Sequence, residues 1–155
     1  MNSKFMEVAL KEAKKAYKLN EVPVGAVIVK DNVIISKAYN LREKNNSSLS
    51  HAEILCIKKA CRKLGTWRLE GCDMYVTLEP CAMCAGAIYW ANIGHVVYAM
   101  TEKRLLELTG SNEQNPTFSL DCRTVFSHGQ KDIKVTGPFP ALEEEAAAVH
   151  KGYWD

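Results

Sequence analysis

Two runs of β-branched residues near the N-terminus constrain the fold more than any other feature of the sequence. The runs VGAVIVK and VIISKAYN are separated only by Asp31 and Asn32. Asp and Asn tolerate the left-handed backbone that a two-residue hairpin turn requires, so this pair predicts two antiparallel strands joined by a tight turn. An isolated hairpin is at best marginally stable in water, so further strands or helices must cover it.

Helical and strand patterns alternate along the chain. Helices are expected over residues 3–19, 50–65, 80–89, 101–108 and 141–152, with one helical turn around CRTVF in the otherwise irregular segment 111–130. Further strands are expected at 73–78, 95–100 and 132–136. The order predicts an α/β fold in a single domain over residues 1–155, with one central sheet and helices packed on it. The helix between strands 73–78 and 95–100 favours a parallel pair with a right-handed crossover.

Two of these helices carry more detailed predictions. The helix from Ser50 should stop at Gly65 and place its larger apolar residues on one face, namely Ile54, Ile57, Cys61 and Leu64. Pro80 suits the first position of the next helix, which would put Cys81 in its first turn.

Composition excludes several classes of protein. Twenty basic residues against 18 acidic ones give a net charge of +2, which is too balanced to indicate a nucleic-acid partner. No apolar run is long enough to span a membrane, and the charged N-terminus does not resemble a signal peptide, so a cytoplasmic protein is expected. Four of the six cysteines are irregularly spaced and are interpreted as free, mostly buried thiols: Cys56, Cys61, Cys72 and Cys122.

The other two cysteines belong to a metal-binding pattern. His51 and Glu53 begin one predicted helix, and Cys81 and Cys84 follow Pro80 at the start of the next. A catalytic zinc site takes three protein ligands and keeps one position open, and one imidazole and two thiolates supply that set. A helix N-terminus favours the thiolate that binds metal. Glu53, two positions beyond His51, is then expected to carry protons rather than to bind the metal.

Two simpler interpretations of these residues stay open. Ser50 and Glu53 match a capping box, in which Glu53 would bond back to the Ser50 amide. The Cys-x-x-Cys pair could belong to a redox site or to a structural zinc site, and the latter would need a fourth ligand such as Cys72 or His95. A structural-zinc binding protein without activity is therefore one alternative to an enzyme.

With these residues in view, the chain resembles the cytidine deaminase superfamily, in the branch that holds bacterial tRNA adenosine deaminases and small guanine deaminases. The resemblance covers roughly residues 3–100 and lies in VPVGAVIV, HAE and TLEPCAMCAGA. It implies a three-layer α/β/α fold with a five-stranded mixed sheet, one Zn²⁺ per subunit held by His51, Cys81 and Cys84, and a homodimer. It also implies that Glu53 shuttles protons and that Asn40, with backbone groups near Ala52 and Cys81, contacts the substrate.

The last third of the chain directs the choice of substrate. The run MTEKRLLELTGSNEQNP replaces a glycine-rich run usual in tRNA enzymes, and LEEEAAAVHKGYWD is acidic where they tend to be basic. An acidic end is a poor partner for an RNA backbone. Small guanine deaminases have a C-terminal segment that closes over the site, in some cases exchanged between subunits. One interpretation of residues 141–155 is such a lid, or an element swapped between subunits, in which Tyr153 and Trp154 stack on the ring; the alternative is an aromatic tail that packs on the sheet or is disordered.

Our main prediction is a hydrolytic deaminase of a free nucleobase, guanine or a related purine or triazine ring, with this small molecule as its partner. The alternative is a tRNA adenosine deaminase acting at the wobble position; tRNA binding is possible on this reading but disfavoured by the tail. Glu143, Glu144 and Glu145 are interpreted as a solvated helical face, with a second proton carrier among them as the alternative. Ser111, Asn112 and Glu113 lie where family members place specificity residues.

Overall fold

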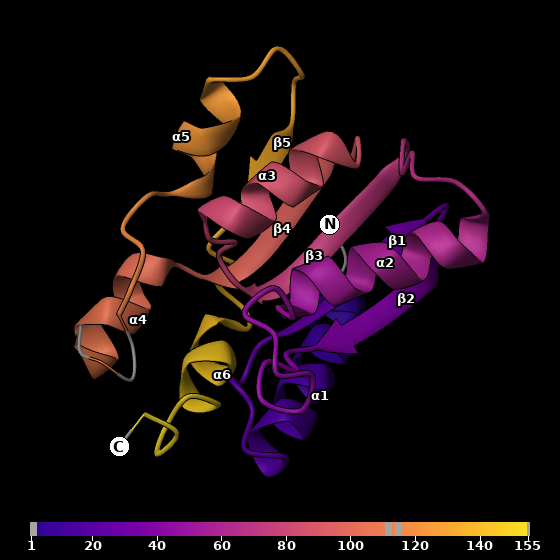
Figure 1. The fold of residues 1–155 in the computed structure, drawn as a ribbon. Helices are drawn as coiled ribbons and strands as arrows, with labels where there is room; N and C mark the ends of the chain where they lie inside the picture. The colour runs from indigo at the N-terminus through magenta and orange to yellow at the C-terminus, as the bar shows by residue number, and fades with distance from the viewer. Residues whose placement is uncertain (1–2, 111–112, 114–115, 155) are drawn as a thin grey trace.

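The computed structural model describes residues 3–110, 113 and 116–154. A five-stranded sheet in the order β2-β1-β3-β4-β5 forms its centre (Figure 1). The strands are β1 (Gly25–Lys30), β2 (Val33–Tyr39), β3 (Cys72–Leu78), β4 (His95–Met100) and β5 (Lys134–Thr136). β1 runs antiparallel to β2 and β3, whereas β3, β4 and β5 are mutually parallel. The predicted mixed sheet is thus confirmed.

The hairpin forms as the sequence predicts. Asp31 and Asn32 have φ angles of 51° and 61°, the left-handed values that a type I′ turn needs at both central positions. Residues of β1 alternate between the two sides of the sheet: Ala26 and Ile28 join one hydrophobic cluster, and Val27 and Val29 join the other. Both faces of this strand are therefore buried, which explains its continuous apolar sequence.

Helices cover both faces and complete three layers. They are α1 (Ser3–Lys18), α2 (Ala52–Leu64), α3 (Ala82–Trp90), α4 (Glu102–Thr109), α5 (Cys122–Ser127) and α6 (Glu143–Ala148). Buried residues of α2, α3 and α5 share the cluster on one face, and those of α1, α4 and α6 share the cluster on the other. Figure 1 shows α2 and α3 lying side by side over the sheet. The predicted α/β/α architecture is confirmed.

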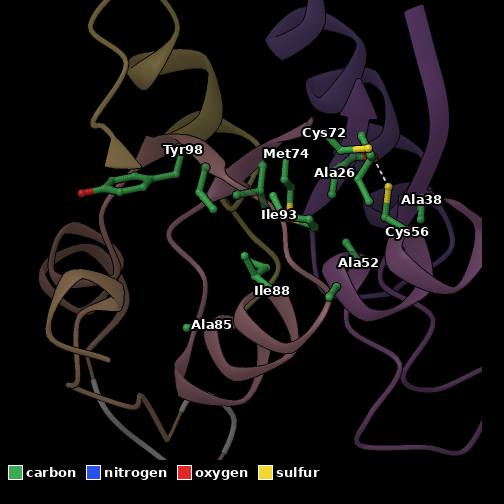
Figure 2. Close-up of a cluster of buried hydrophobic side chains, with 14 of the residues drawn as sticks. Ala26, Ala38, Ala52, Cys56, Cys72, Met74, Ala85, Ile88, Ile93 and Tyr98 are labelled. Carbon is green, nitrogen blue, oxygen red and sulfur yellow. Dashed lines mark hydrogen bonds between the residues drawn. The ribbon is translucent and has the colours of Figure 1, made fainter. Parts of the chain in front are cut away.

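Small side chains let α2 and α3 lie close to the sheet. Figure 2 shows Ala52 of α2 beside Ala26 and Ala38 of the sheet, and Ala85 of α3 farther along, near Ile88; all four alanines are essentially fully buried. The Cys56 thiol donates a hydrogen bond to the Ala26 carbonyl at 3.6 Å. Close packing of this kind leaves the N-terminus of each helix little freedom to move. The residues that begin α2 and α3 are therefore held at fixed positions over the sheet.

Several predicted details are wrong. α2 begins at Ala52 with His51 as its N-cap, and Gly65, with φ of 69°, ends it as expected. The capping box, the alternative interpretation of Ser50 and Glu53, does not form: the N-cap side chain makes no capping bond, and the Ser50 hydroxyl accepts from Asn45 Nδ2 at 3.1 Å. The fully buried residues of α2 are Ala52, Glu53, Cys56 and Ala60, whereas the predicted face Ile54, Ile57, Cys61 and Leu64 is only partly buried. The small residues Ala52, Cys56 and Ala60 occupy the face of the helix that packs on the sheet, so the larger apolar residues lie at the sides of that face.

The helix boundaries after residue 78 also differ from expectation. α3 begins at Ala82, so Cys81 is its N-cap and Pro80 precedes the helix rather than opening it. α6 spans six residues, shorter than predicted, and the chain continues in turns through Tyr153. Among the described residues, no helix combines the length and apolarity of a membrane span.

Candidate metal centre and active-site cavity

The N-termini of α2 and α3 bring the predicted metal ligands together. His51 and Cys81 are the two N-caps, both with extended backbone, and Cys84 follows in the first turn of α3. His51 Nδ1 lies 3.8 Å from Cys81 Sγ and 3.5 Å from Cys84 Sγ. All three ligand atoms lie within 4.8 Å of one another.

These separations fit a tetrahedral zinc ion. Zn–N and Zn–S bonds at the usual lengths with tetrahedral angles require N···S distances of about 3.6 Å. Among the described residues, these three form the only group of three or more potential ligands close enough to share one metal ion. The candidates for a fourth ligand lie elsewhere: Cys72 begins β3, at the end of the strand opposite Leu78, and His95 Nε2 is hydrogen-bonded to Thr136 Oγ1 at 2.8 Å. Three ligands and an open position are the catalytic rather than the structural pattern.

The thiols already favour a metal-binding protonation state. Hydrogen bonding from the Cys84 thiol, with a further contribution from His51, lowers the pKa of Cys81 to about 4. The hydrogen bond to Cys81 and burial raise the pKa of Cys84. One thiolate is thus formed before any cation binds, and a cation would draw the second proton off.

Glu53 lies beside the ligands without belonging to them. It occupies the first turn of α2 and is only 4% exposed. Burial, reinforced by the neighbouring Cys81, raises the pKa of Glu53 to about 7. A carboxyl group with such a pKa can both accept and release a proton near neutral pH.

A cavity of about 450 Å³ opens in front of these residues. Of the residues predicted for the site, five line it: Asn40, His51, Glu53, Cys81 and Trp154. Asn40 is 3% exposed, and its Oδ1 accepts a hydrogen bond from the Arg42 amide at 2.9 Å. Ala52 is completely buried and does not line the cavity. Tyr153 does not line it either, but packs edge-on against Trp154 with ring centroids 4.8 Å apart.

The C-terminal tail reaches the cavity from within the same chain. Trp154 Nε1 donates to His150 Nδ1 at 3.3 Å, and the two rings stack 6.3 Å apart. Glu143 and Glu144 pair with Arg104 of α4 and do not line the cavity, so the idea that they carry a second proton finds no support. Glu113 is exposed, and Ser111 and Asn112 lie outside the described residues.

Some cavity residues escaped the sequence analysis, notably Arg42, Glu79, Glu102 and Phe118. Glu79 directly follows β3, and Glu102 comes two residues after β4. The carboxyl ends of parallel strands meet at one edge of a sheet, so the predicted β3–β4 pair was the signal that could have placed both glutamates at the site. Phe118 had no such signal, because the segment around it carries no periodic pattern.

Comparisons with known proteins agree with this site. Residues 1–100 match the cytidine and deoxycytidylate deaminase zinc-binding region. A tRNA-specific adenosine deaminase of Bacillus subtilis is 55% identical over 94 residues, which are 61% of this chain and 58% of the relative's length. A solved structure from studies of A-to-I editing by tRNA:A34 deaminases is 35% identical with a TM-score of 0.76, covering 96% of this chain and 99% of that one. The guanine deaminase of Bacillus subtilis is 30% identical with a TM-score of 0.67, covering 96% and 94%.

These comparisons overturn our choice of substrate. The relatives of high sequence identity are tRNA-specific adenosine deaminases, at 55% and 52%, whereas the guanine deaminase of Bacillus subtilis is 30% identical. The main prediction of a free-base guanine deaminase that disfavours tRNA is therefore wrong, and the alternative is the better supported one. A physical reason lies in the tail, whose charge we overestimated because Arg104 neutralises two of its three glutamates. The ligand set, the fold and the match over residues 1–100 lead to one conclusion: the chain belongs to the family of the cytidine and deoxycytidylate deaminase zinc-binding region.

Proposed function

We propose that this chain is a zinc-dependent hydrolase that converts adenosine to inosine in tRNA, at the wobble position of the anticodon. The observation that supports this most strongly is the 55% identity to a tRNA-specific adenosine deaminase, in a chain that also places three zinc ligands around an open position. The chain spans 58% of that relative's length, so its activity and its substrate are a proposal.

The residues of the cavity have distinct roles in this proposal. His51, Cys81 and Cys84 would hold the zinc ion, which in such sites lowers the pKa of water and supplies a nucleophile at neutral pH. Glu53 would accept one proton of the attacking water and donate it to the ring nitrogen, and would then carry the second proton of that water to the amino group, which leaves as ammonia. Its burial keeps this proton away from bulk solvent.

Other residues orient the substrate. The Asn40 side chain, fixed by its bond to the Arg42 amide, would present its remaining polar atoms to the base. Trp154 lines the cavity and would stack on the extruded adenine, with Tyr153 supporting it from the edge. Ala52 would contribute through its backbone. Arg42, which also lines the cavity, would meet a phosphate.

The test is inosine formation by zinc-loaded protein. An anticodon stem-loop with adenosine at the wobble position should release ammonia, while the same stem-loop with guanosine there should not. Turnover of free adenine or guanine, with the adenosine stem-loop untouched, would contradict the proposal. The homodimer that the resemblance implies and the cytoplasmic location expected from the charged N-terminus stay predictions, and sedimentation of the purified protein would check the assembly.

A further inference from the structure

Glu79 is a buried charged residue with no part in the chemistry proposed above. It follows β3 directly, precedes Pro80, and is only 5% exposed. A buried carboxylate is costly unless its oxygens accept hydrogen bonds, so its partners point to its role.

Both oxygens of Glu79 accept backbone amides from distant parts of the chain. The Glu102 N–H donates to Oε1 at 3.2 Å, and the Cys122 N–H donates to Oε2 at 3.1 Å. These are the first residues of α4 and α5. The first amides of a helix have no acceptor within the helix, and a carboxylate is their strongest partner. One side chain therefore joins the starts of both helices.

The described residues between these two amides, 102–110, 113 and 116–122, are here called the strap. Its described residues supply much of the outer wall of the cavity: Glu102, Leu105, Pro116, Thr117 and Phe118. The same cavity is lined by His51 and by Cys81, which lies two residues after Glu79. Glu79 is thus two residues from a metal ligand and hydrogen-bonded to both ends of the strap.

We propose that Glu79 is a positioning residue that anchors both ends of the strap and so sets the distance between the outer wall and the metal ligands. It acts through two backbone amides. The individual caps of α4 and α5, Thr101 and Asp121, bond within their own helices and cannot make this connection.

Glu79→Gln tests the proposal. Glutamine has the same shape but offers one acceptor oxygen, so one of the two amides loses its partner. Hydrogen exchange at the Glu102 or Cys122 amide should become at least about tenfold faster, the loss expected for a hydrogen bond to a charged group. Zinc content should stay at one ion per chain. With the stem-loop substrate, KM should rise about tenfold while kcat changes little, because the wall binds substrate and does not react.

Asp121→Ala is the matched control. It removes the cap that accepts from the Thr124 amide at 2.8 Å in the same α5, but it leaves both bonds to Glu79 in place. Exchange should rise near Thr124 while KM stays at the wild-type value. An equal rise of KM in this variant would mean that any weakening of α5 suffices, which would overturn the role of Glu79.

Cys122→Pro keeps the proposal testable if Glu79→Gln fails to fold. Proline is tolerated at a first helical position and removes the N–H that Glu79 accepts. It also replaces the fully buried Cys122 thiol, so its reference is Cys122→Ala, which removes the thiol and keeps the N–H. KM should rise as in Glu79→Gln. Unchanged amide exchange and KM in whichever variant folds would refute the inference. The KM measurement rests on the proposed function, whereas the exchange measurement does not; a wild-type protein inactive on the stem-loop would defeat the function alone.

Discussion

Glu53 combines two properties that rarely occur together in a side chain. Its carboxyl group is nearly inaccessible to solvent, yet it lies beside the three side chains that would hold the zinc ion. Burial disfavours its ionised form, and a cation at the site would favour it. A carboxyl group whose protonated and ionised forms are close in free energy gains and loses a proton readily. A residue that first accepts a proton and then donates it requires this property.

Glu53→Gln should keep the metal and lose turnover. Glutamine preserves the shape of the side chain but cannot transfer a proton, so inosine formation should fall by a factor on the order of 100 to 10,000. Zinc analysis should still give one ion per chain. Glu70→Gln, at an exposed glutamate paired with Arg68, should match the wild type. Full turnover by Glu53→Gln would remove the proton-carrying role.

At the scale of helices and strands, the elements that a local residue pattern determines could be predicted from the sequence. The hairpin at Asp31–Asn32 and the strands β3 and β4 were predicted within a residue or so, because strand pattern and turn chemistry are local. The helices start at Ala52 and Ala82, each two residues later than predicted. At α2 the Ser50 hydroxyl accepts from Asn45 of the preceding loop, and His51 is the N-cap. The wall formed by Glu79, Glu102 and Phe118 depends on contacts between distant segments, and no periodic pattern encodes those.

Gly25→Ala should be strongly destabilising because β1 begins against the backbone of α1. A Cβ at this position would lie 2.1 Å from the Ala9 carbonyl oxygen and 2.5 Å from the Ala13 nitrogen. Separating a strand from a helix costs about 3 kcal/mol, at the upper end of typical overpacking. Urea unfolding of the zinc-loaded protein measures the loss.

Gly86→Ala in α3 is the paired control, since a Cβ there would meet nothing within 4 Å. It should stabilise the protein by about 0.5–1 kcal/mol through helix propensity. Equal unfolding midpoints for the two variants would show that the contact between β1 and α1 is looser than described.

The C-terminal tail is predicted to contribute to substrate binding. Trp154→Ala, or removal of residues 152–155, should raise KM for the stem-loop by about 5- to 100-fold, as expected for the loss of one stacked base. Trp67→Ala, at a tryptophan that is 63% exposed and away from the cavity, is the control and should leave KM unchanged. The same KM in both variants would mean that the tail only packs against the domain.

For the molecule as a whole, His150 links stability to pH. It is 3% exposed, and burial lowers the pKa of its imidazole from 6.5 to about 4. Protonation therefore favours the unfolded chain. The contribution of His150 to stability is complete above pH 6.5 and is lost as the pH falls toward 4.

Between pH 7 and pH 5 the wild type should lose about 2 kcal/mol more stability than His150→Gln, whose side chain does not titrate. Unfolding of both proteins at the two pH values measures this difference, and the comparison cancels the protonation of groups that they share. Parallel losses in the two proteins would show that the imidazole is accessible to protons in the folded state.

The order of the cavity walls along the chain has a consequence for how such proteins diverge. The groups assigned to bond breaking lie between His51 and Cys84, whereas the strap and the tail that line the cavity begin at Glu102. Replacing the gene beyond that point would exchange the part of the recognition surface that these two segments supply, and would leave the reactive centre, Asn40 and Arg42 as inherited. Any replacement segment would have to supply two backbone amides that donate to Glu79, as Glu102 and Cys122 do. Substrate range can therefore change by recombination at a single boundary, without an intermediate that lacks the chemistry.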